Sequence, residues 1–116
     1  MIDINERWPK LTAWFENEFG MESDTQSMFF IIGVQELGKG VQDFNKTQKV
    51  ELIHIGVCTI LSKDGYYVLS HRDDDGWPHF ENTKKLPVLK GNEQDQFLKE
   101  ALIVYFEAVI KAQKGI

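Results

Sequence analysis

Glu51 and His54 are the first residues whose types and spacing could support chemistry. In a helix, Glu-x-x-His places a carboxylate and an imidazole on one face, as in bundle proteins that hold two carboxylate-bridged metal ions. Cys58 follows one turn beyond His54, and all three side-chain types can bind transition metals. A two-metal site needs a second Glu-x-x-His, and the sequence contains only this one. The alternative is a histidine at the edge of the core that is hydrogen-bonded to Glu51 or to a carbonyl.

The segment from His71 to His79 is a second candidate metal site, because it combines two histidines with three consecutive aspartates. A calcium-binding EF-hand loop is excluded, since a loop that began at Asp73 would have Lys84 where a bidentate glutamate is required. His71, His79 and Asp75 could instead form a three-ligand zinc site if a hairpin brings the two histidines to face each other. The alternative is that the aspartates are solvated and that Asp75 only favours a turn.

The same stretch also indicates a recognition surface. It concentrates aromatic side chains beside an arginine, and these residue types predominate in binding hot spots. The candidate binding residues are Tyr66, Tyr67, Arg72, Trp77 and Phe80. The alternative is that these rings pack onto the helices and cover the end of the core.

No pattern indicates covalent catalysis. Neither Ser62 nor Ser70 lies in a Gly-x-Ser-x-Gly turn. Cys58 lies in an apolar segment, where a thiol is inert unless a cation lowers its pKa. The sequence has no phosphate-binding loop and no dinucleotide-binding motif. We therefore expect a non-catalytic protein without a cofactor, and a bound transition metal is the alternative.

Composition limits the classes of partner and location. The chain has 116 residues and a net charge of −5, with no cluster of lysine and arginine, which argues against nucleic acid and anionic membrane surfaces. Its longest uncharged runs are about half the length of a membrane-spanning helix. A single cysteine excludes an internal disulfide, and the N-terminal residues lack the features of a secretion signal. We therefore expect an acidic, cytoplasmic protein.

The elements that must position these residues are mainly helices. The spacing of apolar residues predicts a mainly α, four-helix bundle-like fold in a single domain, 1–116. The predicted helices cover approximately residues 7–19, 25–37, 46–62 and 92–112. A short β-hairpin or structured loop is expected at 65–91, between the third and fourth helices, with a two-residue turn at Asp75-Gly76. Pro78 restricts the return arm of this hairpin to a sheet edge.

Three details of the helix assignments depend on particular residues. Pro9 is tolerated if it lies in the first turn of the first helix, which places the start near Arg7. The run from Met28 to Val34 has the composition of a buried strand, but its polar continuation favours a helix. Asn45 and Gln48 form a capping-box pattern at the start of the third helix.

The predicted helices also carry an inference about assembly. The second and third are apolar around most of their circumference, and the fourth has only a narrow polar strip, whereas a helix in a small monomer normally exposes a broad polar face. A partner is the simplest cover for this surface, and a two-fold homodimer is the commonest arrangement. The alternative is that the aromatic-rich hairpin and the first helix already cover it. Gly33 and Gly56 lie inside these helices at a cost of about 1 kcal/mol each. Close approach of two helices would explain both glycines, and the alternative is a local kink.

Two functions follow from these patterns. The first hypothesis is a non-catalytic helical module that self-associates and binds a protein partner through the aromatic residues. The alternative is a metal-dependent or small-ligand-binding protein that uses the histidine and carboxylate residues.

Overall fold

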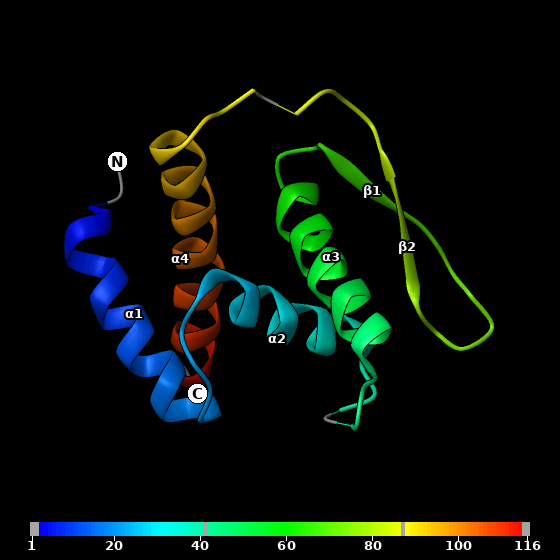
Figure 1. Cartoon of the computed structure of the whole chain (residues 1–116), viewed down its shortest axis with the longest axis horizontal. Coiled ribbons are helices and arrows are strands. Elements are labelled where there is room, and N and C mark those ends of the chain that lie inside the picture. Colours follow the sequence, from blue (N-terminus) through cyan, green and yellow to red (C-terminus); the bar gives the residue numbers. More distant parts are fainter. Residues whose placement is uncertain (1–2, 41, 87, 115–116) are drawn as a thin grey trace. The chain divides into compact units, whose positions relative to one another are not determined.

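The computed structural model of the chain describes residues 3–40, 42–86 and 88–114. These residues are mainly helical, with four helices and one two-stranded antiparallel sheet (Figure 1). The elements in chain order are α1 (Ile4–Phe19), α2 (Thr25–Leu37), α3 (Lys46–Ser62), β1 (Tyr67–Arg72), β2 (Pro78–Asn82) and α4 (Asn92–Lys114). Within the described residues, no helix combines the length and the apolar character that crossing a membrane requires.

The helix starts follow local capping signals. The predicted capping box of α3 is confirmed, because Gln48 N–H donates to Asn45 Oδ1 at 2.8 Å and Asn45 N–H donates to Gln48 Oε1 at 3.0 Å. The predicted start of α1 near Arg7 is wrong. Asp3 caps the helix by accepting the Glu6 N–H at 3.3 Å, so Pro9 lies inside α1, beyond its first turn.

The apolar run from Met28 to Val34 is helical, as predicted, and the strand alternative is wrong. Helix α2 buries residues on nearly all sides, including Met28, Phe29, Ile32 and Val34. Apolar residues all round a helix are typical of a buried element. The composition of this segment therefore reflects burial and not sheet formation.

Residue contacts divide the chain into two compact units. The first contains the described residues up to Thr25 and from Val88 onward, and the second begins at Gln26 and includes the hairpin. The first unit therefore holds α1 and α4, and the second holds α3, the hairpin and almost all of α2. A single bundle of four helices stays a prediction.

Aromatic side chains form the contact between α1 and α4 in the first unit. Phe15 and Phe106 are fully buried, and their ring centroids lie 5.7 Å apart in an edge-to-face arrangement. The rings of Trp14 and Phe106 are also in contact, with centroids 5.9 Å apart. At the surface, Arg7 of α1 and Glu107 of α4 form an ion pair at 3.6 Å. Buried rings of this kind contribute through their apolar area and through edge-to-face geometry.

In the second unit, α2 and α3 cross (Figure 1), and one glycine of each helix lies against the backbone of the other. A Cβ atom placed on Gly33 would lie 2.0 Å from the carbonyl oxygen of Leu52, and one on Gly56 would lie 2.0 Å from that of Phe29. The predicted close approach of two helices is therefore confirmed. Beside the crossing, a buried cluster gathers residues of α2, α3 and the intervening loop: Val34, Leu37, Phe44, Leu52 and Ile55.

The hairpin packs against α3 and contains one irregularity. Leu69 pairs with Phe80, but the next pair is His71 with His79, so Ser70 is an extra residue in a β-bulge. The hairpin prediction is confirmed, and Pro78 begins β2 in a two-stranded sheet, where a proline is tolerated at an edge.

The predicted two-residue turn at Asp75-Gly76 is wrong. The turn runs from Asp73 to Gly76 and is closed by the Gly76 N–H, which donates to the Asp73 carbonyl at 2.9 Å. Asp73 N–H in turn donates to the Trp77 carbonyl at 3.0 Å. The loop between Asp73 and Trp77 therefore has three residues. Gly76 has a φ of +86°, the left-handed residue that ends this class of loop.

Candidate functional site

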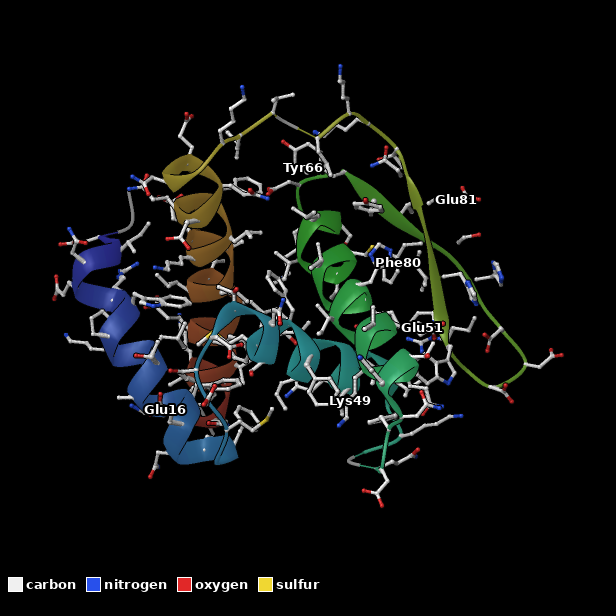
Figure 2. The ribbon with its side chains drawn as sticks, in the orientation of Figure 1. Glu16, Lys49, Glu51, Tyr66, Phe80 and Glu81 are labelled. Atoms are coloured by element: carbon white, nitrogen blue, oxygen red, sulfur yellow. The ribbon has the colours of Figure 1, made fainter. Side chains whose placement is uncertain are left out.

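The second unit contains a pocket of about 460 Å³ between α3 and the hairpin. Figure 2 shows Phe80 between β2 and α3, and Glu51 on the side of α3 that faces the hairpin. The lining combines carboxylates, imidazoles, aromatic rings and aliphatic side chains. The lining residues are Val50, Glu51, His54 and Ile55 of α3, and Asp73, Trp77, Pro78, His79 and Phe80 of the hairpin.

Helix α3 brings Glu51 and His54 to the same pocket, as the Glu-x-x-His spacing predicts. The imidazole Nε2 of His54 lies 3.5 Å from the Sγ atom of Cys58, one turn further along the helix. Cys58 is fully buried, and this burial raises the pKa of its thiol to about 11. The contact with His54 therefore does not produce a thiolate at neutral pH, and Cys58 is not an activated nucleophile.

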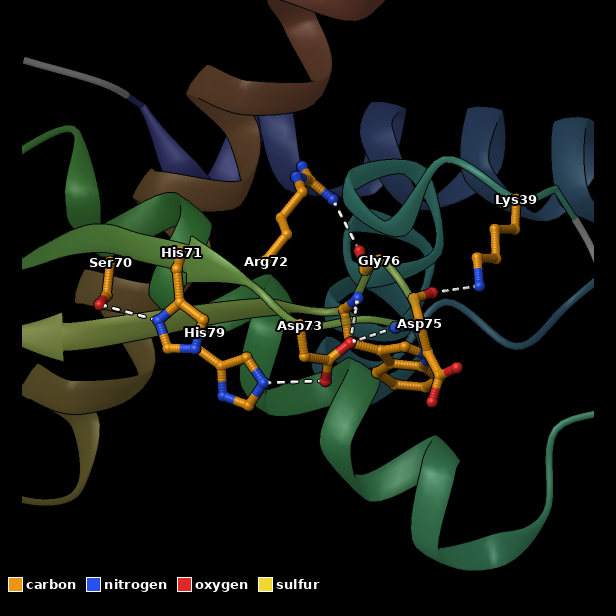
Figure 3. A network of polar contacts seen from close by, with 9 residues as sticks. Lys39, Ser70, His71, Arg72, Asp73, Asp75, Gly76 and His79 are labelled. Atoms are coloured by element: carbon orange, nitrogen blue, oxygen red, sulfur yellow. Dashed lines mark hydrogen bonds and ion pairs between the residues drawn. The ribbon is translucent and has the colours of Figure 1, made fainter.

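Asp73 organises the hairpin side of the pocket (Figure 3). Its Oδ1 atom accepts the backbone N–H groups of Asp75 and Trp77, each at 3.0 Å, and its Oδ2 atom lies 3.0 Å from Nε2 of His79. The hydrogen bond from His79, followed by that from the Trp77 backbone, lowers the pKa of the Asp73 carboxyl below its usual value. Asp73 is therefore ionised at neutral pH.

The bulge at Ser70 places His71 opposite His79, and the two imidazoles stack with centroids 4.8 Å apart and planes 5° apart (Figure 3). The prediction that these histidines face each other is confirmed. A metal ion binds through a nitrogen lone pair that lies in the plane of the ring. Because the two planes are nearly parallel, one ion cannot lie in both, and shared ligation would require one ring to rotate.

The other predicted metal ligands are also separated. Asp75 contributes backbone groups, since its carbonyl accepts a hydrogen bond from Lys39 Nζ and its N–H donates to Asp73 (Figure 3). Among the residues that the structure describes, no three His, Cys, Asp or Glu side chains are grouped closely enough to hold a metal ion. Glu51, His54 and His79 share a pocket, but they do not converge on one point within it.

The predicted recognition residues have partners within the second unit. Trp77 is half-buried and makes an edge-to-face contact with Phe44 at 6.3 Å, and Phe80 packs against the same cluster. The Lys84 Nζ atom lies over the Tyr66 ring, 4.6 Å from the ring centroid. Tyr67 is half-buried and pairs with Asn82 across the hairpin. Trp77 and Phe80 therefore pack against the buried cluster and also line the pocket.

Arg72 has a structural role at the rim of the hairpin. Its guanidinium donates to the Gly76 carbonyl at 3.1 Å, to the Glu36 carbonyl at 3.1 Å and to the Glu36 carboxylate at 3.3 Å. Glu36 lies in the last turn of α2, where a cation favourably opposes the negative end of the helix dipole. Arg72 therefore connects the hairpin turn to the end of α2.

Asp73 is the site residue that the sequence interpretation did not select. Aspartate at the first position of a turn, with glycine three residues later, is a favoured pattern, and Asp73 to Gly76 fits it. The Asp75-Gly76 pair fits a shorter turn equally well, and that turn predicts Asp75 as the structural carboxylate in place of Asp73. The relevant signal was therefore present in the sequence, but it was ambiguous.

Comparison with protein families, with curated proteins and with solved structures found no match to this chain.

Proposed function

We propose that the second unit is a binding domain for a small organic ligand, and that the ligand occupies the pocket between α3 and the hairpin. One observation carries this proposal: Glu51 and His54 of α3 line the same hollow as Trp77 and His79 of the hairpin. These residues come from separate candidate groups of the sequence, and packing brings them together.

The form of the pocket supports this class of ligand. Sites for small molecules typically measure about 300–1,000 Å³ and combine an apolar lining with a few polar groups. Here Ile55, Pro78 and Phe80 provide apolar surface, while Glu51 and His54 provide polar groups. The pocket thus offers both burial for an apolar body and groups that can orient it.

Two other predictions receive less support from the same geometry. A recognition surface for a protein partner requires aromatic side chains on an open face, but Trp77 and Phe80 pack against the buried cluster and also line the pocket. A metal site at His71 and His79 requires one of the stacked rings to rotate. We therefore favour an organic ligand. Homodimer formation and a cytoplasmic location stay predictions from the sequence.

Fragment binding to isotope-labelled protein would test the proposal. The panel contains aromatic and aliphatic fragments that carry hydroxyl, amide, carboxylate or amine groups, and binding is followed by backbone amide shifts in two-dimensional NMR spectra. At least one fragment is expected to shift the amides of 50–55 and 77–80 together, in a saturable manner. These two stretches are distant in sequence and share the pocket.

A blocking variant and a matched control locate the binding. Val50 is 61% exposed at the pocket, so Val50→Phe is expected to occupy its opening without disturbing the core. Lys49→Phe adds the same ring at the preceding exposed position, which does not line the pocket. Binding should be lost in Val50→Phe and retained in Lys49→Phe. Equal binding by both variants, or no fragment bound by the unmodified protein, would contradict the proposal.

A further inference from the structure

We infer that the ligand of this pocket is an organic cation, with an ammonium or guanidinium group on an apolar body. This inference rests on the proposed function and names the class of ligand that the site would take.

The charges of the lining are the first support. Its nine residues include the carboxylates of Glu51 and Asp73, and none of the nine, all within the described residues, is lysine or arginine. The two remaining titratable residues are histidines, whose Nε2 atoms lie against other groups: His54 against Cys58, and His79 against Asp73. A cation therefore enters a site with two fixed negative charges, whereas an anion would meet the same two charges without a fixed positive one.

The two carboxylates have different availability. Asp73 already accepts three N–H groups, from Asp75, Trp77 and His79, so it contributes charge more than free hydrogen-bonding capacity. Glu51 is exposed, and its carboxylate makes no hydrogen bond or ion pair with another described residue. Glu51 is therefore the group that can accept hydrogen bonds from an ammonium or guanidinium group.

Aromatic rings in the lining favour the same class of ligand. Trp77 and Phe80 both line the pocket and are both half-buried, so part of each ring faces the hollow or its rim. Cations are attracted to the faces of aromatic rings, and tryptophan is the strongest partner. A carboxylate beside tryptophan in a hollow with an apolar lining thus suits a cation that also carries an apolar group.

Three probes with one ring and three charges would test the inference on the complete chain. The probes are 2-phenylethylamine (cationic at pH 7), 2-phenylethanol (neutral) and phenylacetate (anionic), and dissociation constants come from NMR shifts of the pocket amides and the Trp77 indole N–H. We expect the amine to bind at least about threefold more tightly than the alcohol and phenylacetate to bind most weakly, as one partly exposed ion pair would provide. Raising the salt concentration should reduce this preference.

Charge-removing variants assign the preference to a residue. Glu51→Gln is expected to weaken binding of the amine about threefold to fivefold and to weaken binding of the alcohol less, because only the amine loses an ion pair. Glu81→Gln is the matched control, because Glu81 is exposed on β2, on the side away from α3, and does not line the pocket (Figure 2). An equal loss in both variants would show a general effect of net charge and would overturn the assignment to Glu51.

A fourth probe distinguishes the sources of the cation. Nα-acetyl-lysine methylamide carries an ammonium group on a protein-like backbone, so tighter binding than the free amine assigns the site to a side chain of a partner, and weaker binding assigns it to a free amine.

Equal binding of the ring-matched probes, or preference for phenylacetate, would overturn the inference and leave the binding pocket in place. Absence of pocket shifts with every probe would overturn the inference, and the fragment panel would then decide the proposed function separately.

Discussion

Asp73 shows how one exposed side chain can define a local structure. Its carboxylate joins two backbone N–H groups of the turn to the imidazole of His79, which lies across the hairpin. Its backbone N–H and carbonyl also close the turn, with Trp77 and Gly76. The position of Trp77 and His79 at the pocket therefore depends on Asp73.

Acid is expected to weaken this arrangement in a specific pH range. The pKa of Asp73 is lowered in the folded protein, chiefly by the hydrogen bond from His79. Its contribution to stability is therefore complete above the usual value of 3.8 and is lost as the pH falls through the lower, folded value. Thermal unfolding midpoints measured between pH 7 and pH 2 should show that Asp73→Asn is less stable than the unmodified protein at neutral pH, and that this difference disappears in acid.

The adjacent residue provides the control for this prediction. Asp74 is exposed in the same turn, and Asp74→Asn removes an equal charge. Its difference from the unmodified protein should change little over the same pH range. A parallel loss in both variants would attribute the effect to net charge and not to the hydrogen bonds of Asp73.

Sequence patterns predicted the residue types that form the site. They did not select which of the aspartates organises the turn. Each of the three consecutive aspartates suits a turn, so their composition alone does not select the one whose carboxylate accepts hydrogen bonds. That selection depends on the loop length and on the bulge at Ser70, which sets the pairing of His71 with His79. These are properties of strand pairing, which the local sequence specifies weakly.

At the scale of elements, the crossing of α2 and α3 is the feature most sensitive to small changes. A methyl group on Gly33 would meet backbone atoms of Leu52, which cannot rotate away as a flexible side chain could. Gly56 faces the backbone of Phe29 in the same manner. The two glycines therefore set the distance between the helices.

Gly33→Ala is expected to destabilise the protein although alanine favours helix formation. The gain in helix propensity is about 1 kcal/mol, whereas overpacking typically costs about 1–3 kcal/mol and more where backbone must move. Because a Cβ on Gly33 would lie 2.0 Å from a backbone oxygen, we expect the overpacking cost to lie at the upper end of this range. The free energy of unfolding, measured by urea denaturation, should then fall by about 1–2 kcal/mol. Ala13→Gly, at an exposed position of α1, measures the propensity term alone. An unchanged or increased stability of Gly33→Ala would contradict the close crossing.

Helices were predicted well because their signals are local. The observed bounds of α2 and α3 coincide with the predicted ranges 25–37 and 46–62, since capping residues and apolar spacing act within a few residues. Two signals conflict at the start of α1: Pro9 favours a start near Arg7, whereas Asp3 and Glu6 form a capping pattern that favours the observed start at Ile4. Proline inside a helix is unfavourable but tolerated, so the capping signal was the better guide here.

At the scale of the whole molecule, the pocket illustrates what local patterns cannot supply. Glu51 and His79 are separated by most of α3 and the first arm of the hairpin, and they line one hollow because the hairpin packs against α3. No periodicity in the sequence specifies that contact. The grouping of contacts into two units likewise depends on tertiary packing, and a single four-helix bundle stays a prediction.

Less apolar helix surface is left uncovered to support the predicted homodimer than the sequence alone suggests. Part of the apolar surface of α2 and α3 is covered inside the second unit, by the helix crossing and by Phe44, Trp77 and Phe80. Val68 and Leu69 remain exposed on β1, a strand of a two-stranded sheet. Such an edge is a natural place for association between copies.

Light scattering at micromolar concentration tests this prediction. A homodimer has twice the 13.4 kDa mass of one chain. Replacing Val68 and Leu69 together by lysine should give a single-chain mass, because edge lysines oppose strand pairing. A single-chain mass for the unmodified protein would contradict the prediction directly.

The contacts of Arg72 have a consequence for the rate at which a ligand enters and leaves. Arg72 holds the hairpin turn to the Glu36 carbonyl, which belongs to the last turn of α2. The hairpin tip therefore cannot move away from α2 without breaking the hydrogen bonds of Arg72 to Glu36. Arg72 does not line the pocket, so a residue outside the lining can influence how long a ligand stays bound.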